Sequence, residues 1–181
     1  MGPAGSCATP LGVKTAGKAA LLGANTGGRL PKMNLESRVG SRGNAMTFIK
    51  PYLIRLSHCD PTGFVFYPNY FHIFNALVED WFYEALEIPF DVLLMERRLS
   101  LPTVRLETTF SKPTRMGETV DFWLTATHIG RTSLRLTMGV DKNGENRVRM
   151  NRTAVCISQE TDRPIDIPED VRQKIADFMR G

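Results

Sequence analysis

The sequence predicts an α+β fold in which a five-stranded antiparallel sheet wraps around one long central helix. Nine of the 16 aromatic residues fall between Phe64 and Tyr83, which is too much apolar mass for a helix at the surface. Beyond residue 100 the hydrophobic pattern changes to period two, the repeat of a strand with one buried face. Short turn motifs join these stretches, so neighbouring strands are expected to pair antiparallel. Such a sheet must bury one face, and the aromatic helix is the only large apolar partner.

Length and composition are those of one ordinary globular domain. The chain has 181 residues, of which 42% are hydrophobic and 23% charged. These values exclude a disordered chain, a fibrous repeat and a disulfide-built miniprotein. The sequence contains no run of about 18 apolar residues, so it predicts no membrane-spanning helix. The chain has three cysteines, an odd number, and they form no CxxC motif: Cys7, Cys59 and Cys156. This pattern favours a reducing, cytoplasmic location over a disulfide framework or a zinc knuckle.

The composition changes sharply near residue 45. Residues 1–45 hold nine of the 15 glycines and no aromatic residue, so this segment cannot bury enough apolar surface to offset the entropy of ordering. We therefore expect a disordered leader over 1–45 and one folded domain over 46–181. Three origins of the leader stay open. It is a non-native or over-extended start, since Met33 and Met46 both stand where a shorter chain could begin, or a transit peptide, or a myristoylation signal at Gly2.

The net charge of +4 comes from the leader. Residues 1–45 contain six basic residues against one acidic residue, a net charge of +5, whereas residues 46–181 contain 17 basic and 18 acidic residues, a net charge of −1. The folded part therefore lacks the overall positive field of a nucleic-acid-binding protein. A local basic patch could still bind a phosphate-bearing ligand.

The first elements of the domain are a strand, a turn and the long helix. The partial alternation of apolar residues predicts a strand over 47–57. Residues 60–63 (Asp-Pro-Thr-Gly) suit a tight turn, each for a separate steric or hydrogen-bonding reason. The helix is expected over 67–86, because apolar residues recur there at spacings of three and four, and Pro68 is well tolerated in the first helical turn.

The remaining elements follow from turn signals and alternation. A short helix or turn is expected over 89–98, and Asp141-Lys142-Asn143-Gly144 is a strong hairpin signal because Asn-Gly accepts positive φ. The other expected elements are strands over 101–112, 120–126, 134–140 and 147–158 and an amphipathic helix over 168–180.

Asp60 is the most informative candidate for chemistry. A turn-capping Asp before Pro is common, so a structural role is one interpretation. The other follows from its place just ahead of a helix N-terminus, where free backbone N–H groups and the positive end of the helix dipole lie. A carboxylate there can act as nucleophile or base on a carbonyl whose oxygen the N–H groups polarise.

The other polar candidates have plainer interpretations. In His58-Cys59-Asp60 the side chains of neighbouring residues diverge, which argues against a triad, and nothing enforces a metal site from these residues and His72. The remaining candidates are expected to be ordinary structural or surface polar residues: Asn69, His72, Glu79 and His128.

A basic hairpin is a candidate phosphate contact. In Gly130-Arg131-Thr132-Ser133, the guanidinium, the hydroxyls and the backbone donors suit a phosphate, although turn chemistry alone also explains the motif. Five further basic residues could supplement it: Lys112, Arg115, Arg147, Arg149 and Arg152.

Residues 60–70, Asp-Pro-Thr-Gly-Phe-Val-Phe-Tyr-Pro-Asn-Tyr, resemble the D-x-x-G-x-V-x-x-x-N-Y signature of the hotdog-fold acyl-CoA thioesterases, in the branch of 4-hydroxybenzoyl-CoA thioesterase. Weaker matches lie at 88–90, at 101–102 and at the 130–133 hairpin, so the resemblance spans about 48–160. It implies a hotdog fold, a homodimer that assembles to a homotetramer, active sites at the subunit interface, and no metal or other cofactor, since CoA is part of the substrate.

The resemblance also implies roles for individual residues. Asp60 would be the catalytic carboxylate, and the Tyr67 backbone N–H would polarise the thioester carbonyl. The substrate-binding residues would be Gly63, Pro68, Asn69 and Phe90, together with Arg131, Thr132 and Ser133, which would bind the nucleotide or pyrophosphate end of CoA. Leu101 stands where the 4-hydroxybenzoyl enzymes have a polar residue and Phe90 where they have a larger aromatic, so an aryl or a short- to medium-chain acyl group stays open.

Two other functions remain possible from the sequence. One is a hotdog hydratase or dehydratase on acyl thioesters, for which His72 is the only helical histidine. The other is a non-catalytic acyl-CoA-binding module. The first would reveal itself by adding water to an enoyl-CoA, and the second by binding acyl-CoA without turnover.

Overall fold

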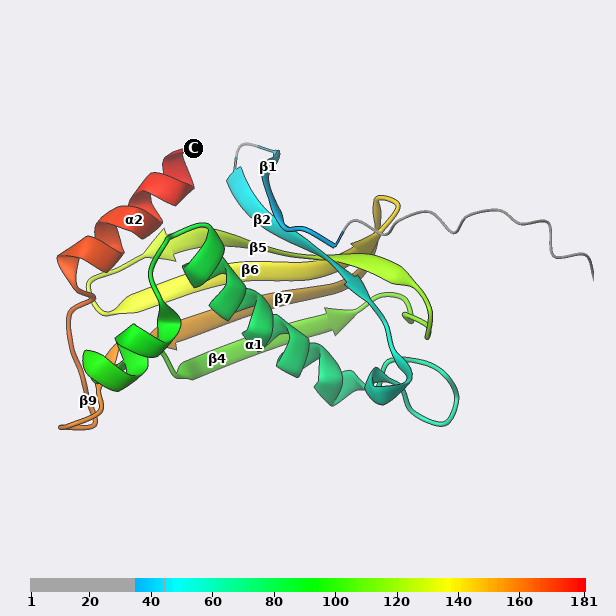
Figure 1. The fold of residues 1–181 in the computed structure, drawn as a ribbon, viewed down its shortest axis with the longest axis horizontal. Helices are drawn as coiled ribbons and strands as arrows, with labels where there is room; N and C mark the ends of the chain where they lie inside the picture. The colour runs from blue at the N-terminus through cyan, green and yellow to red at the C-terminus, as the bar shows by residue number, and fades with distance from the viewer. Residues whose placement is uncertain (1–34, 44) are drawn as a thin grey trace, which may run out of the picture. The chain divides into compact units, whose positions relative to one another are not determined.

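The structure is a computed structural model that describes residues 35–43 and 45–181. Its main feature is a six-stranded antiparallel sheet in the order β1-β2-β5-β6-β7-β4, with a long helix across one face (Figure 1). The strands of this sheet are β1 Arg38–Arg42, β2 Ala45–Leu53, β4 Thr103–Phe110, β5 Thr119–Ile129, β6 Ser133–Lys142 and β7 Glu145–Val155. The predicted α+β class is confirmed, but the expected number of five strands is wrong.

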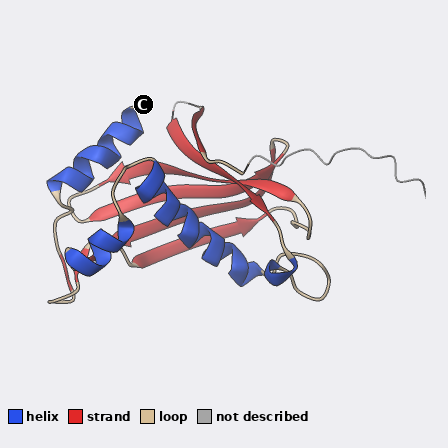
Figure 2. Cartoon of the chain, in the orientation of Figure 1, coloured by secondary structure: helices blue, strands red, loops and turns tan. Residues whose placement is uncertain are grey.

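Shorter elements complete the fold. A small second sheet has three strands in the order β3-β8-β9. Strand β3 follows the main helix in the sequence, and β8 and β9 follow the last long strand. The helices and the short helical turns are drawn in blue in Figure 2. These elements are β3 Leu99–Ser100, β8 Ile157–Ser158, β9 Arg163–Pro164, the helices α1 Tyr67–Glu84 and α2 Glu169–Arg180, the 3₁₀ turn η1 Leu56–His58 and the π-helical turn η2 Val92–Glu96.

Helix α1 forms where the sequence predicts it, within two residues at its C-terminal end. Its apolar residues lie on one side because they recur every three or four positions. The buried side chains are Tyr70, Ile73, Phe74, Leu77, Val78, Trp81 and Phe82. They pack on the sheet through contacts such as the edge-to-face pair of Phe74 and Phe122, whose ring centroids are 5.2 Å apart. This layer is the core of the domain.

Helix α2 covers the same face of the sheet beside the end of α1. Its Val171 and Ile175 are buried, and the ring of Phe178 meets that of Trp81 with the centroids 5.4 Å apart. The expectation of one helix inside the sheet is therefore corrected, because β2 and β5 extend beyond α1 and their apolar residues need a second cover.

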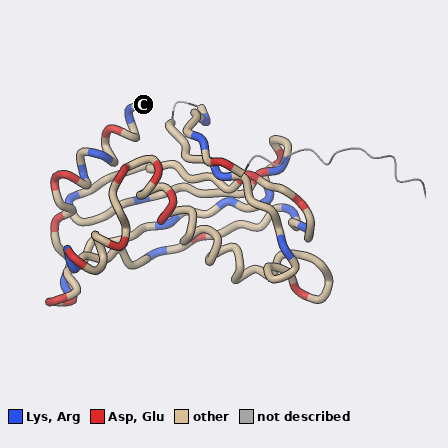
Figure 3. The backbone as a smooth tube through the Cα atoms, viewed as in Figure 1, with Lys and Arg blue, Asp and Glu red and all other residues tan. Residues whose placement is uncertain are grey.

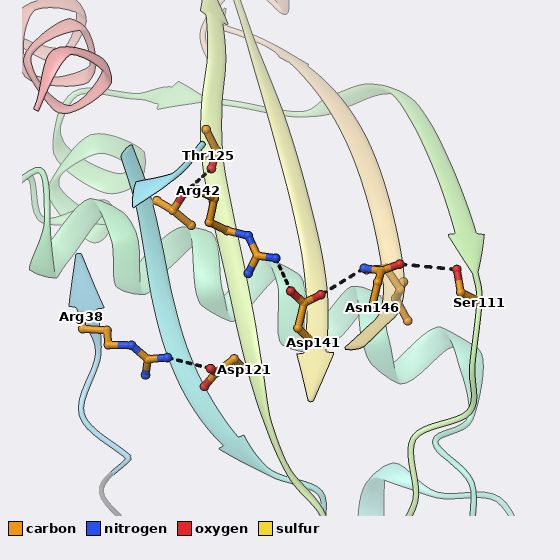
Figure 4. A network of polar contacts seen from close by, with 9 residues as sticks. Arg38, Arg42, Ser111, Asp121, Thr125, Asp141 and Asn146 are labelled. Atoms are coloured by element: carbon orange, nitrogen blue, oxygen red, sulfur yellow. Dashed lines mark hydrogen bonds and ion pairs between the residues drawn. The ribbon is translucent and has the colours of Figure 1, made fainter. Parts of the chain in front are cut away.

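The ordered region begins before residue 46, where the sequence placed its border. Strand β1 pairs antiparallel with β2, from Arg38 opposite Ile49 to Arg42 opposite Ala45. Figure 4 shows how its two arginines reach across the sheet: Arg38 binds Asp121 at 2.7 Å and Arg42 binds Asp141. An edge strand held by backbone and ion pairs needs no apolar alternation, which is why the pattern missed it. The expectation of a disordered leader otherwise falls on residues 1–34, outside the described part of the chain.

The tight hairpin between β6 and β7 is confirmed. Asn143 and Gly144 both have positive φ, 51° and 80°, as a two-residue turn of matching twist requires.

Charged residues of both signs are spread along the backbone of the described residues in Figure 3, and the first twelve residues of α1 carry no charge. Within the described residues no helix is long and apolar enough to cross a membrane.

Candidate active site

The residues predicted to carry the chemistry lie in a short loop that leads into α1. Residues 58–60 run antiparallel to 64–66: Cys59 bridges Val65, Phe66 N donates to His58 O at 3.0 Å, and Asp60 N donates to Phe64 O at 2.9 Å. Gly63 closes the turn with φ of 80°, a conformation that a side chain at this position would strain. The loop is thus a small hairpin that fixes Asp60 close to the helix start.

The carboxylate of Asp60 is held in its ionised form. Its Oδ1 accepts a hydrogen bond from the Thr62 hydroxyl and another from Thr62 N at 2.8 Å. The hydroxyl bond is the main reason that the pKa of Asp60 lies below its usual value. The group is at the surface of this chain, so it is available to a ligand or to a second subunit. Sequence reasoning did not single out Thr62, although a hydroxyl two residues after Asp is a known turn pattern.

The start of α1 offers a free donor beside this loop. Tyr67 is the first helical residue, and its N–H has no carbonyl one turn earlier in the helix to bond. Pro68 has no N–H, and the N–H of Asn69 donates to Phe66 O at 2.8 Å. Tyr67 N–H therefore is the donor that the first helical turn leaves open, at the positive end of the helix dipole.

Asn69 and two loop contacts hold this arrangement in place. The Asn69 side-chain amide donates to His58 O at 2.9 Å, which ties the helix to the loop. Val65 N donates to Thr114 O at 2.9 Å, and Met116 N donates to Gly63 O at 3.0 Å. The structure thus gives Asn69 a positioning contact, one that its place in the first helical turn predicted.

The alternative groups beside Asp60 are less suited to chemistry. Partial burial raises the pKa of the Cys59 thiol, and its Sγ lies 3.5 Å from Arg55 O. His58 accepts a hydrogen bond from Arg55 N at Nδ1, and burial lowers its pKa. His72 and His128 are exposed. Among residues 35–43 and 45–181, no three His, Cys, Asp or Glu side chains are close enough together to hold a metal ion.

The predicted CoA-binding hairpin lies at the opposite end of the sheet from Asp60. Strand β5 starts near the Asp60 loop, where Ile54 N bonds Glu118 O, and ends at Ile129, just before Arg131. It is 11 residues long, about 34 Å at a rise of ~3.4 Å per residue. One chain therefore brings Asp60, Gly63, Tyr67, Pro68 and Asn69 together but leaves Arg131, Thr132 and Ser133 at a distance.

The hairpin itself is open to ligands. Arg131 is 78% exposed and forms an ion pair with Asp166 at 2.6 Å. It borders a surface hollow of ≈ 600 Å³ that Arg172, Glu169 and Pro168 also line. Phe90 lies at the same end of the sheet, packed edge-to-face on Phe82 with ring centroids 5.1 Å apart. The sequence could not reveal this separation, because it depends on strand direction and pairing.

The loop and helix that carry Asp60 and Tyr67 lie within a region that matches a known protein family. Residues 54–175, which include the Asp60 loop, α1 and most of the sheet, match the model of the thioesterase-like superfamily. The chain belongs to the thioesterase-like superfamily. The protein is therefore a thioester hydrolase with the hotdog fold, and the resemblance found in residues 60–70 is confirmed at the level of this superfamily.

Solved structures share the fold of this superfamily member. A protein described as a predicted thioesterase from Bacillus stearothermophilus is 25% identical, with a TM-score of 0.64 over 74% of this chain and 96% of its own. A 1,4-dihydroxy-2-naphthoyl-CoA thioesterase from Synechocystis is 18% identical, with a TM-score of 0.67 over 73% and 97%. A protein from Staphylococcus aureus, solved in complex with CoA, is 19% identical, with a TM-score of 0.67 over 77% and 87%. A search of curated proteins finds no match.

Proposed function

We propose that the protein hydrolyses an aryl- or short- to medium-chain acyl-CoA to the free acid and CoA, in the manner of the 4-hydroxybenzoyl-CoA branch. The observation that carries this proposal is the Asp60 carboxylate, hydrogen-bonded by Thr62 in a fixed hairpin that leads directly to the N–H of Tyr67 at the start of α1. The solved relatives that act on or bind CoA compounds support the substrate class.

The chemistry assigns each group one task. The thioester carbonyl oxygen accepts a hydrogen bond from Tyr67 N–H, which stabilises the negative charge that develops there. By one route the Asp60 carboxylate attacks the carbonyl carbon, the C–S bond breaks to release CoA thiolate, and water hydrolyses the mixed anhydride to the free acid and the original carboxylate. By the other, the carboxylate takes a proton from a water that attacks the carbonyl carbon, and the C–S bond then breaks. In both routes a proton released from water ends on the CoA thiolate. Both routes need the carboxylate ionised, which the Thr62 hydrogen bonds favour.

A homodimer paired along β4 would complete the site. Within the described part of the chain, strand β4 is an edge of the main sheet, and its Val104, Leu106 and Phe110 are 60%, 42% and 46% exposed. An edge strand with exposed apolar side chains is a template for a second copy. Phe110 contacts Tyr70, so a partner here would also lie against α1. The step from such dimers to a tetramer is part of the same proposal.

Antiparallel pairing would join the two separated halves of the site. The start of β4 lies at the same end of the sheet as Arg131 and Phe90, and its end lies beside Tyr67. Figure 1 shows β4 at the edge of the main sheet. A two-fold axis between the two β4 strands, level with their midpoints, puts the end of one strand beside the start of the other. Asp60 and Tyr67 of one subunit would then face the Phe90 end of its partner, whose Arg131 could reach the CoA phosphates.

Release of thiol from a panel of acyl-CoA esters tests the function. The panel runs from acetyl to palmitoyl and includes benzoyl and 4-hydroxybenzoyl esters, with Asp60→Asn and the matched control Asp162→Asn run beside the native protein. Asp162 lies in an exposed turn at the far end of the sheet. We expect Asp60→Asn to lower kcat by about 100-fold or more, roughly 2.7 kcal/mol of barrier, and the control to leave it unchanged. Full activity of Asp60→Asn would refute the mechanism.

A further inference from the structure

A cavity between α1 and the strand ends lies at the start of β4, away from Asp60 of the same chain. Its volume is ≈ 290 Å³, near the lower limit for pockets that hold small molecules. Val78, Phe90, Leu94 and Pro102 give it apolar walls, and Arg152 of β7 also lines it. A cavity of this size and character accepts one ring or a short chain.

Arg152 is a cation in this cavity that pairs with no carboxylate of the described residues. Its Nη1 donates to Asn75 Oδ1 at 3.1 Å and its Nη2 to Leu101 O at 3.3 Å, while its Nε is buried and has no acceptor. Among the described residues it forms no ion pair. Burial lowers its pKa, which reflects how poorly the site solvates a positive charge. A partly buried guanidinium has five N–H donors, and two of those of Arg152 have protein acceptors, so the group has bonding capacity to spare.

Asn75 lines the same cavity and brings a second donor to it. Its Oδ1 accepts the hydrogen bond from Arg152, and its amide N–H₂ has no protein acceptor among the described residues. Glu79, one turn further along α1, lines the cavity and is exposed. The cavity therefore combines apolar walls with a donor-rich end and one acid at the surface.

The position of the cavity fits the dimer proposed above, on which this inference rests. The cavity lies at the start of β4, so antiparallel pairing of two β4 strands puts Asp60 of the partner subunit at the same end. An acyl group whose thioester lies at that carboxylate could extend into the cavity. Its far end would then meet Arg152 and Asn75.

We infer that this cavity binds the acyl group and that Arg152 selects acyl groups with an oxygen acceptor at the end far from the thioester. Carboxylate, hydroxyl and oxo oxygens share the required chemistry. A carboxylate would bind the guanidinium most strongly but would also face Glu79, whereas a neutral oxygen would not be repelled. The sequence groups Arg152 with the basic residues that could supplement a phosphate contact, and we assign it a different task on the ground of its contacts with Asn75 and Leu101 in the cavity.

Matched pairs of esters test this inference. The pairs are hexanoyl- against adipoyl-CoA, hexanoyl- against 6-hydroxyhexanoyl-CoA, and benzoyl- against 4-hydroxybenzoyl-CoA, and the measured quantity is the ratio of kcat/KM within each pair. One hydrogen bond to a charged donor predicts a preference of about 10- to 100-fold for the oxygenated member of at least one pair. The first two pairs distinguish a carboxylate from a neutral oxygen.

Variants separate selection from a structural role. Arg152→Met should reduce the preferred ratio to near one while kcat/KM for the plain ester holds or rises. Arg135→Met is the control, because Arg135 is an exposed arginine on the other face of the sheet, and it should keep the native ratio. If Arg152→Met does not fold, Arg152→Lys, which keeps the charge but loses the two-pronged geometry, should still reduce the ratio at least threefold.

Two results would overturn the inference. One is a native ratio near one in all three pairs, and the other is an Arg152 variant that loses both esters of a pair equally. Calorimetric binding of the same pairs to Asp60→Asn protein reads the discrimination without turnover. Preference in binding with no hydrolysis by native protein would contradict the proposed function but support the acyl site, whereas hydrolysis without preference would do the opposite.

Discussion

Replacing Gly139 by Ala should destabilise the protein strongly, because the ring of Trp123 lies against this glycine. A Cβ at Gly139 would come within 2.5 Å of Trp123 Cζ2, 2.7 Å of Trp123 Cε2 and 2.8 Å of Val148 O. Real Cβ atoms do not approach other heavy atoms this closely, so the ring or the β6–β7 backbone must move. Trp123 is 2% exposed, on the face of the sheet opposite α1.

The magnitude follows from what a shift of the ring would break. The guanidiniums of Arg42 and Arg149 lie 4.4 and 4.5 Å from the ring centroid. Forcing one carbon into a packed site costs about 1–3 kcal/mol, and each cation–π contact contributes about 0.5–1 kcal/mol. Gly139→Ala should therefore lower the free energy of unfolding by about 2–5 kcal/mol.

Urea unfolding followed by tryptophan fluorescence measures this loss. Gly40→Ala is the matched control, since Gly40 is also a strand glycine but a Cβ there meets only Ile49 Cδ1 at 3.9 Å. It should stay within about 0.5 kcal/mol of the native protein or gain slightly through a less flexible unfolded chain. In a Trp123→Leu background, Gly139→Ala should cost at least ~1 kcal/mol less than in the native background.

The reasoning would be refuted by Gly139→Ala protein that unfolds within about 0.5 kcal/mol of the native protein. It would also be refuted in part if the full cost persisted in the Trp123→Leu background. The close contact with Val148 O, and not the ring, would then be responsible for the loss.

Two further predictions concern the candidate active site. Thr62→Val removes the hydroxyl that lowers the pKa of Asp60, and because hydrolysis needs the ionised carboxylate, the acid limb of the pH profile of kcat/KM should move to higher pH. Thr62→Ser keeps the hydroxyl and should leave the acid limb in place. An acid limb that does not move in Thr62→Val would contradict the assignment. Asn69→Ala removes the bond to His58 O that ties the loop to α1, so kcat should fall by about 5- to 20-fold with KM little changed. An equal loss in Asn69→Gln, whose amide is displaced by one methylene, would fit positioning, and full activity of Asn69→Ala would exclude it.

The local elements of the fold could be predicted because their information is local. The aromatic residues of 67–84 recur at helical spacing, and Asn143-Gly144 suits a turn that no bulkier pair fits as well. The Asp60 loop was found for the same reason, since its turn residues and the helix start are adjacent in the sequence. Its partner Thr62 follows two residues later, a signal that was present but not used.

Strand β1 and the two ends of the proposed site could not be predicted in this way. The segment 38–42 is held by pairing with β2 and by contacts to Asp121 and Asp141, residues about 80 to 100 positions away. The distance between Asp60 and Arg131 depends on the direction and length of β5. These features arise from long-range pairing, which leaves no periodic pattern in the segment concerned.

The sequence by itself determined the long apolar helix, the strands with alternating residues, the turns and the Asp60 loop, because each depends on side chains within a few positions. Only the tertiary structure decided which strand lies at the open edge, that Arg152 faces a cavity beside α1 and that Arg131 lies across the sheet from Asp60. The reason is physical: a side chain's chemical role depends on the groups it contacts, and for these residues most of those groups come from distant parts of the chain.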